Sequence, residues 1–379
     1  MNNVTVLRGL LMCFLGPLAM IPGSAQKAAD GELRLNQIQV IGTHNSYHIE
    51  PAEGVMNLIR TFTPKTADSI QYTHRPLEQQ LGELGVRQLE LDLYADPEGG
   101  LFAEPVANRM LRKQGGQGHD PTGVLKKPGI KILHSPDFDF LTTALTFVEA
   151  LKTIRAWSQA NSHHVPIMIL LELKETGSPL GGRLRKFDAA QLDGVDQEIL
   201  SVFQRKEILA PDDVRGGAQT LREVIVEKGW PSLREVRGKV MFALDNGRHL
   251  RNAYLKDHPS LRGRLLFVSV DENDPAAAFF KLNDPVGGFD QIQRLVKAGF
   301  LVRTRADSDT VQARKNDPAK REKALASGAQ FVSTDYPEAN AAFSNYCVRF
   351  SGGIVARPNP VSGALGVERV DPEKAPAQE

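Results

Sequence analysis

Eight short runs of apolar and β-branched residues constrain the fold of this chain more than any other feature, because longer segments of different pattern separate them. The runs are Ile38–Ile41, Leu89–Leu93, Ile130–Leu133, Ile167–Leu173, Val240–Leu244, Leu265–Val270, Phe300–Thr304 and Phe331–Thr334. Strands that alternate with helices are typical of βα units around a parallel sheet. Eight is the number of strands in a TIM barrel, so the sequence predicts an α/β protein with a (β/α)8 barrel.

The segments between the runs support this architecture. Apolar residues recur at helical spacing in two of them, at Phe147, Val148, Leu151, Ile154 and Trp157, and at Phe289, Ile292, Leu295 and Val296. The connection over residues 94–130 is long and rich in glycine, which is typical of a functional or flexible loop. We expect the barrel domain to cover residues 33–345, and residues 346–379 to form a closing segment and a loose tail.

The first 25 residues have the pattern of a secretory signal peptide. Arg8 precedes the apolar run Gly9–Ile21, and Gly23-Ser24-Ala25 offers a small-x-Ala cleavage site. A membrane anchor is the alternative, but this run is interrupted by Pro17 and is too short to span a hydrocarbon core of about 30 Å. We therefore expect residues 1–25 to be removed and the mature protein to be secreted or periplasmic.

Composition and charge exclude several classes of protein. The hydrophobic content of 41% and the charged content of 24% are those of an ordinary globular domain. Loss of Arg8 with the signal peptide takes the formal net charge from +1 to 0, so we expect no nucleic-acid partner. Loss of Cys13 leaves Cys347 as the single cysteine, so no intrachain disulfide can form. We expect a monomer stabilised by its core or by a bound metal.

Reactive side chains gather at the carboxyl ends of four expected strands, which is where TIM barrels place their chemistry. The residues are His44 and Asn45 after the first strand, Glu90 and Asp92 on the second, His134 after the third, and Glu172 and Lys174 at the fourth. Any one of them could be structural. Their coincidence at successive strand ends favours an active site.

The spacing and chemistry of these residues predict a metal site. Side chains two residues apart on a strand share a face, which places Glu90 beside Asp92. Asn45, Glu90, Asp92 and Glu172 offer only oxygen ligands, which suit calcium or magnesium better than zinc. A simple ion pair between Glu172 and Lys174 is the alternative for that strand. The two histidines could transfer protons near neutral pH.

Four stretches that contain these residues resemble the calcium-dependent phosphatidylinositol-specific phospholipases C of bacterial type. They are Gly42-Thr43-His44-Asn45-Ser46-Tyr47-His48, Leu89-Glu90-Leu91-Asp92, Leu133-His134-Ser135-Pro136-Asp137-Phe138-Asp139-Phe140 and Pro166-Ile167-Met168-Ile169-Leu170-Leu171-Glu172. The stretches 301–307 and 331–337 are also similar to that family, so the likeness runs from about Gln37 to Pro337.

The resemblance implies a barrel of the phospholipase C-like phosphodiesterase type. It implies one calcium ion, rather than magnesium, bound by Asn45, Glu90, Asp92 and Glu172. It also implies two steps, in which the inositol 2-hydroxyl attacks phosphorus to release diacylglycerol and the cyclic phosphate is then available for hydrolysis. We expect His134 to be the general acid and His44 a donor to the phosphoryl oxygens, while Glu90 and His44 both remain candidates for the general base.

The same resemblance suggests the residues that bind substrate. Lys174 and one of Arg303 and Arg305 would add positive charge near the phosphate, although either arginine could instead lie at the solvated rim. Asp335 and Tyr336, at the end of the last strand, would contact the sugar. The expected partner is a phospholipid or a soluble phosphodiester. Peripheral contact with a membrane is compatible with this, although the sequence contains no evident basic amphipathic helix for an anionic bilayer.

Two other functions compete with this interpretation. Glycerophosphodiester phosphodiesterases are also metal-dependent TIM barrels, and Glu172-Leu173-Lys174 resembles their Glu-x-Lys element. That family favours His-Arg after the first strand, whereas this chain has His44-Asn45. A secreted protein that binds a phospho-ligand without turnover is the second alternative. Retention of both histidines and all the oxygen ligands argues against it.

Overall fold

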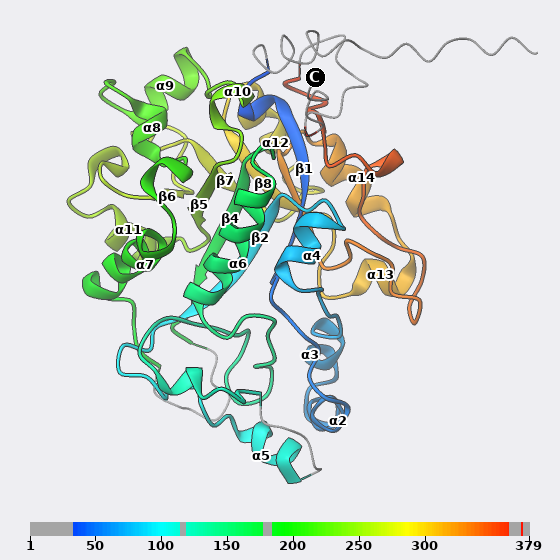
Figure 1. The fold of residues 1–379 in the computed structure, drawn as a ribbon. Helices are drawn as coiled ribbons and strands as arrows, with labels where there is room; N and C mark the ends of the chain where they lie inside the picture. The colour runs from blue at the N-terminus through cyan, green and yellow to red at the C-terminus, as the bar shows by residue number, and fades with distance from the viewer. Residues whose placement is uncertain (1–32, 114–118, 177–183, 364–372, 374–379) are drawn as a thin grey trace, which may run out of the picture.

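The computed structural model describes residues 33–113, 119–176, 184–363 and 373 (Figure 1). The expected signal peptide, residues 1–25, lies outside this part of the chain, as do residues 364–372 and 374–379 of the expected closing segment and tail. No helix among the described residues combines the length and the apolar character needed to cross a membrane.

Within the described residues, the strands form one ten-stranded sheet. Eight strands follow one another in the order β6-β5-β4-β2-β1-β9-β8-β7, and each neighbouring pair is parallel. These strands are β1 (Ile38–Thr43), β2 (Gln88–Tyr94), β4 (Ile167–Leu173), β5 (Val240–Leu244), β6 (Leu266–Val268), β7 (Phe279–Lys281), β8 (Leu301–Arg305) and β9 (Phe331–Thr334). A parallel bridge between Ser269 and Phe279 joins the two ends. The predicted (β/α)8 barrel is therefore confirmed.

One of the eight expected strands was assigned wrongly. The run at Ile130–Leu133 contains β3 (Lys131–Ile132), which pairs antiparallel with the end of β2 and lies outside the barrel path. The missing barrel strand is β7, which follows β6 in the chain. Because β7 has only three residues, it is too short to show a strand period.

Helices pack on the outside of the barrel (Figure 1). The described helices are α2 (Glu53–Phe62), α3 (Pro64–Ser69), α4 (Leu77–Gly82), α5 (Val106–Lys113), α6 (Phe147–Ala160), α7 (Ala189–Val202), α8 (Pro211–Arg215), α9 (Leu221–Glu227), α10 (Leu233–Val236), α11 (Arg248–Leu255), α12 (Phe289–Lys297), α13 (Val311–Lys315) and α14 (Ala319–Ala326). The two helices predicted from apolar spacing are α6 and α12. Helices α2, α3 and α5 belong to the connections after β1 and β2 and gather at one end of the barrel (Figure 1).

The barrel strands have continuous apolar sequences because both of their faces are buried. Apart from Glu172, every residue of β4 is buried, because one face lines the barrel interior and the other packs under helices. Helix α6 begins where the Thr146 hydroxyl accepts a hydrogen bond from the Glu149 N–H at 3.2 Å. The polar residues of β2 and β4 therefore stand out against an apolar background.

The segment after residue 345 covers the amino-terminal part of β1. Strand β10 (Ala356–Pro358) pairs antiparallel with residues 38–40 of β1, where β2 does not yet reach. Tyr346, Val348 and Phe350 are buried in one cluster with residues of β1 and β9. Residues 346–358 therefore pack against β1 and β9.

Candidate active site

Three carboxylates meet at the carboxyl ends of β2 and β4. Glu90 and Asp92 are buried on β2, and Asp92 lies opposite the half-buried Glu172 in the parallel ladder between the two strands. One oxygen of each of the three carboxylates lies within 4.8 Å of the others. The two-residue period places Glu90 and Asp92 on one face, as expected, and the parallel register of β2 and β4 brings Glu172 to them.

Asn45 completes a set of oxygen ligands. It follows β1 with a φ of 45°, a left-handed conformation that asparagine tolerates better than most residues. The next residue, Ser46, donates its N–H to Glu90 O at 2.9 Å, which holds the Asn45 backbone beside β2. The amide nitrogen of Asn45 donates to the Tyr72 hydroxyl at 3.1 Å, whereas its buried Oδ1 has no hydrogen-bond partner. A buried oxygen of this kind needs a partner such as a cation.

Electrostatics also favour a cation among the carboxylates. Burial raises the pKa of Glu90 to about 8, an effect that Arg303 opposes and that neighbouring carboxylates increase. Burial, and then the charge of Asp92, raise the pKa of Glu172 to about 7. Neither oxygen of Asp92 accepts a well-formed hydrogen bond. Ionised forms of all three groups therefore require additional positive charge.

Two basic side chains of the protein supply part of the positive charge that these carboxylates require. Arg303 is buried and donates to Glu90 from its guanidinium, and Lys174 Nζ lies 3.1 Å from Asp92 Oδ2 and 3.3 Å from Glu172 Oε1. Three carboxylates thus face two basic side chains. The all-oxygen donor set, the unpartnered Asn45 oxygen and the remaining negative charge fit a calcium ion.

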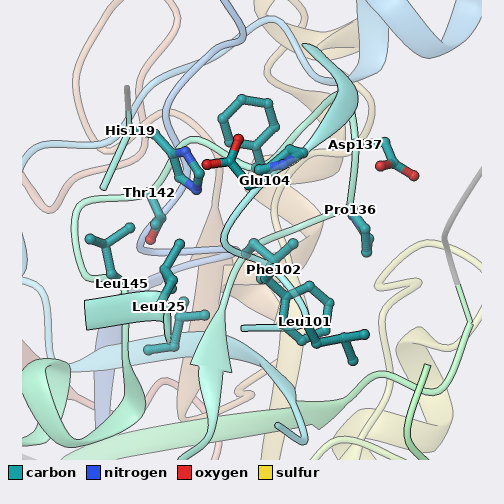
Figure 2. Close-up of a pocket in the computed structure, with 13 residues that line it drawn as sticks. Leu101, Phe102, Glu104, His119, Leu125, Pro136, Asp137, Thr142 and Leu145 are labelled. Carbon is teal, nitrogen blue, oxygen red and sulfur yellow. The ribbon is translucent and has the colours of Figure 1, made fainter. Parts of the chain in front are cut away.

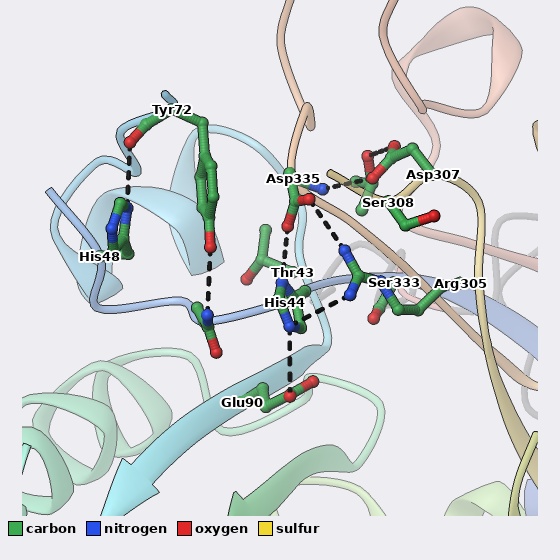
Figure 3. A network of polar contacts seen from close by, with 12 residues as sticks. Thr43, His44, His48, Tyr72, Glu90, Arg305, Asp307, Ser308, Ser333 and Asp335 are labelled. Carbon is green, nitrogen blue, oxygen red and sulfur yellow. Dashed lines mark hydrogen bonds and ion pairs between the residues drawn. The ribbon is translucent and has the colours of Figure 1, made fainter. Parts of the chain in front are cut away.

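His44 lies directly after β1 and is held by a buried carboxylate (Figure 3). Its Nδ1 lies 2.7 Å from Asp335 Oδ1, and Arg305 contributes a guanidinium nitrogen 3.2 Å from its Nε2. Burial, reinforced by the charge of Arg305, lowers the pKa of His44 to about 3. His44 is therefore neutral near pH 7, with Nδ1–H donating to Asp335 and the Nε2 lone pair accepting from Arg305.

Asp335 is itself fixed from two sides. The second guanidinium nitrogen of Arg305 donates to Asp335 Oδ2 at 2.9 Å, and the Asp335 N–H donates to Asp307 Oδ1 at 2.8 Å (Figure 3). Although burial opposes it, the charge of Arg305 and the hydrogen bond from His44 hold the pKa of Asp335 below its usual range. The carboxylate that orients His44 is thus ionised.

His134 has a separate carboxylate partner. It follows β3, and its Nδ1 lies 2.6 Å from Asp139 Oδ2, while the Tyr94 hydroxyl donates to His134 O at 3.0 Å. Burial lowers the pKa of His134, but the hydrogen bond and charge of Asp139 outweigh this, so the net pKa is raised. His134 therefore lies in the loop after β3 rather than at the end of a barrel strand.

The remaining predicted residues lie in different surroundings. Arg303 is 1% exposed and also donates to Ser333 Oγ at 2.7 Å, so it is not a rim charge. Arg305 contacts His44. Tyr336 is buried, with its hydroxyl 3.5 Å from Gln71 O, in the cluster that covers β1 and β9. Contact of Asp335 and Tyr336 with a sugar stays a prediction.

Sequence reasoning missed several residues of this end of the barrel. Asp139 lies in one of the stretches that resemble the family, 133–140, but nothing in the spacing pairs it with His134. Asp245 directly follows β5, and Lys281 ends β7, with its Nζ 2.6 Å from Asp245 Oδ2. A strand-end position is the signal that could have found Asp245. Lys281 could not be found because its strand was not recognised.

A small cavity lies within the connection between β2 and α6 (Figure 2). Its volume is about 40 Å³, and its lining includes Leu101, Phe102, Leu125 and Pro136. A space of this size holds a few water molecules and is too small for a lipid head group. It lies in the loop that carries His134 and does not by itself define a substrate site.

Comparison with solved structures agrees with the fold. A calcium-dependent phosphoinositol-specific phospholipase C from a Gram-negative bacterium, Pseudomonas sp., matches with a TM-score of 0.54 at 16% identity, covering 87% of this chain and 96% of that one. Its myoinositol complex has the same TM-score and identity, with coverage of 89% and 99%. A Ca²⁺-dependent phosphatidylinositol-specific phospholipase C from Streptomyces antibioticus matches with a TM-score of 0.49 at 17% identity, covering 80% and 95%.

Comparison at the level of sequence identifies the family. No curated protein matches this chain. Residues 33–360 match the family described as phosphoinositide phospholipase C, Ca²⁺-dependent, which is well over half of the sequence. These residues include the carboxylate cluster and both histidine–aspartate pairs. The chain therefore belongs to the calcium-dependent phosphoinositide phospholipase C family.

Proposed function

We propose that the protein is a phosphatidylinositol-specific phospholipase C that cleaves the bond between glycerol and phosphate. The inositol 2-hydroxyl attacks phosphorus, the P–O bond to glycerol breaks, and the products are diacylglycerol and a cyclic inositol phosphate. One observation carries the proposal beyond family membership. Two histidines, each with its own buried aspartate, have surroundings that shift their pKa values in opposite directions. Such pairs are typical of an acid and a base in one site.

His44 is the general base in this proposal. When the substrate phosphate draws Arg305 away from Nε2, that nitrogen takes the proton of the 2-hydroxyl, and Asp335 stabilises the imidazolium that forms. Glu90, the other candidate left open by the sequence, is less suitable because Arg303 occupies one of its oxygens and the proposed calcium ion would take the other. This assignment replaces the expected role of His44 as a donor to the phosphoryl oxygens.

His134 is the general acid. Asp139 accepts a hydrogen bond from Nδ1–H and supports the protonated ring, so Nε2–H can give its proton to the departing glycerol oxygen. The diacylglycerol then leaves as a neutral alcohol. After the first step His44 carries the proton and His134 lacks one, which suits them to exchange roles for hydrolysis of the cyclic product.

Positive charge near the phosphate completes the site. The side chains of Arg305 and Lys174 are 12% and 19% exposed, so both can meet a ligand from the barrel mouth. A calcium ion bound by Asn45, Glu90, Asp92 and Glu172 would lower the pKa of the attacking hydroxyl and stabilise negative charge in the transition state. Export, peripheral membrane contact and a monomeric state remain predictions.

Glu172→Gln is expected to lower calcium affinity by at least about tenfold, or ~1.4 kcal/mol, while the barrel stays folded. The change removes one anionic ligand from a half-buried position that Lys174 also contacts. Calcium titration followed by calorimetry measures the effect. The pH dependence gives a second readout, because the free protein has the raised pKa values of Glu90 and Glu172, about 8 and 7.

The sign of that pH effect follows from the two carboxyl groups. A carboxyl with a raised pKa stabilises the metal-free fold at low pH, and this stability is lost as pH rises through about 7 to 8. Calcium should therefore raise the melting temperature more at pH 8 than at pH 5. Glu198→Gln is the matched control, because Glu198 also has a pKa raised by burial but lies on α7 against Ile130 N. Full activity in excess chelator would contradict the site.

The first product from phosphatidylinositol is expected to be a five-membered cyclic phosphate. A well-positioned internal hydroxyl has an effective molarity of about 10⁵ to 10⁸ M, far above that of water, so intramolecular attack should prevail. Phosphorus NMR at early times separates this product from acyclic esters. Equal turnover of phosphatidylcholine, whose head group has no neighbouring hydroxyl, would instead favour a glycerophosphodiester phosphodiesterase. Binding of substrate with no product at all would favour a protein that binds a phospho-ligand without turnover.

A further inference from the structure

His48 is a buried histidine that the proposed reaction does not use. It is fully shielded from solvent, and both of its ring nitrogens have partners. Nδ1 lies 3.0 Å from Tyr72 O, and Nε2 lies 2.9 Å from Asp139 Oδ1. A peptide carbonyl can only accept a hydrogen bond, so the Nδ1 position must carry a hydrogen.

Asp139 connects His48 to His134. Its two oxygens are divided between the histidines, with Oδ1 facing His48 Nε2 and Oδ2 lying 2.6 Å from His134 Nδ1. The reciprocal backbone hydrogen bonds between Ser135 and Asp139, at 2.8 and 3.2 Å, hold the carboxylate in a tight turn. Although burial opposes it, the charge of His48 and the hydrogen bonds from both rings hold the pKa of Asp139 below its usual range. An ionised Asp139 therefore accepts from both histidines.

The three groups could also be considered as metal ligands, since their ligand atoms lie within 4.8 Å of one another. The separations of 2.9 and 2.6 Å from Asp139 to the two rings are hydrogen-bond distances. Each carboxylate oxygen is already used by one ring. The cluster is therefore closed by its own hydrogen bonds, which favours a positioning role over a cation site.

Packing fixes the His48 ring in place. The ring stacks on Tyr72 with centroids 4.4 Å apart and meets the His134 ring edge-on at 5.8 Å (Figure 3 shows His48 with Tyr72). The hydroxyl of Tyr72 also accepts from the Asn45 amide, whose other atom is the unpartnered Oδ1. One buried network thus runs from a proposed calcium ligand to the proposed acid.

We propose that His48 is a positioning residue for the general acid, and that it acts by holding Asp139 in the orientation in which Asp139 aligns His134. Without the His48 donor, Asp139 Oδ1 would be a buried anionic oxygen with no partner and would rotate or bind water. His134 would then lose its alignment toward the leaving oxygen. The inference rests on the proposed function, because it assumes that His134 is the acid.

Two substitutions separate the hydrogen bonds of His48. His48→Gln can place its amide nitrogen near the Nε2 position and keep the donor to Asp139, whereas His48→Asn can replace only the Nδ1 donor to Tyr72 O. His48→Asn is expected to lower kcat on phosphatidylinositol by about 10- to 100-fold with little change in KM. His48→Gln should restore most of that loss.

The dependence of kcat on the leaving group distinguishes a positioning role from a structural one, because a purely structural defect would lower kcat equally for all leaving groups. Each variant is compared on phosphatidylinositol, with its alkoxide leaving group, and on an inositol phosphate ester with an aryl leaving group, which needs little help from an acid. The loss in His48→Asn should be confined to phosphatidylinositol. His164→Asn is the matched control, since His164 is equally buried, bonds Ser158 and Val165 O, and lies before β4 at the opposite end of the barrel.

Equal losses on both substrates, or equal losses in His48→Asn and His48→Gln, would overturn the inference and leave His48 as a core residue. If His134→Ala itself lacks leaving-group selectivity, the proposed acid is wrong and the inference falls with it. If His48→Asn does not fold, NMR of the histidine rings in the wild-type protein still decides. Hydrogens on both His48 nitrogens, with Nε2–H bonded to a carboxylate, are expected. A single ring hydrogen would contradict the network.

Discussion

Asp335→Asn is expected to lower kcat on phosphatidylinositol by about 10⁴-fold with little change in KM, the size of loss seen when the carboxylate behind a catalytic histidine becomes an amide in serine proteases. Both oxygens of Asp335 accept hydrogen bonds, from His44 Nδ1 at 2.7 Å and from Arg305 at 2.9 Å. An asparagine has one oxygen and one NH₂ group, so it can accept from only one of these two donors.

The arginine decides how the amide is oriented. Because a guanidinium can only donate, the asparagine oxygen would turn toward Arg305 and its NH₂ group toward His44. His44 would then accept at Nδ1 and carry its hydrogen on Nε2. That is the wrong tautomer for a base, since the nitrogen facing the substrate would have no free lone pair.

Steady-state kinetics with saturating calcium measure this loss. Asp196→Asn is a matched control, because Asp196 is also mostly buried and accepts from Tyr254 OH at 2.8 Å, but it lies on the outer helix α7. It should lower thermal stability and leave kcat nearly unchanged. A loss of less than about tenfold in Asp335→Asn would instead point to Glu90 as the base.

The carboxylate cluster was predictable because local rules control it. Strand period places Glu90 and Asp92 on one face, and parallel pairing puts Asp92 opposite Glu172. A carboxylate in an otherwise apolar strand also indicates that a cation or a metal lies nearby, because a buried charge without a partner is costly. For these residues the sequence pattern and the barrel architecture lead to the same arrangement.

The partners of the histidines were not predictable in this way. Asp335 lies 291 residues from His44, and only closure of the barrel between β1 and β9 brings them together. Arg303 and Arg305 share a strand face, but one is used by Glu90 and the other by His44 and Asp335, a division that depends on side-chain reach. Tertiary packing determines which partner each arginine contacts, and the spacing of residues in the sequence does not show it.

The error at β3 has a similar origin. The run at Ile130–Leu133 has a strand pattern because it does pair with β2, but it pairs antiparallel and outside the barrel. Periodicity indicates that a segment is extended and says nothing of its partner. His134 was therefore placed in the site for the wrong topological reason, although the loop does bring it to Asp139.

His134→Ala is expected to lower kcat by about 10² to 10⁴-fold on phosphatidylinositol, and by less than about tenfold on the inositol ester with an aryl leaving group. A general acid lowers the barrier by giving a proton to the departing oxygen. A glycerol alkoxide is a strong base and needs that proton, whereas an aryl oxide can leave without it. Comparing kcat on the two substrates for wild type and variant measures the selectivity.

Asp335→Asn provides the contrasting case. It impairs removal of the proton from the attacking hydroxyl, and both substrates share that hydroxyl, so its losses should be similar for the two leaving groups. His134→Ala should therefore change the ratio of the two rates, while Asp335→Asn should leave that ratio nearly constant. If both variants change the ratio of the two rates equally, His134 and His44 do not act separately as general acid and general base. If His134→Ala loses equally on both substrates, His134 binds or orients substrate, and the Asp139 pair serves structure rather than proton transfer.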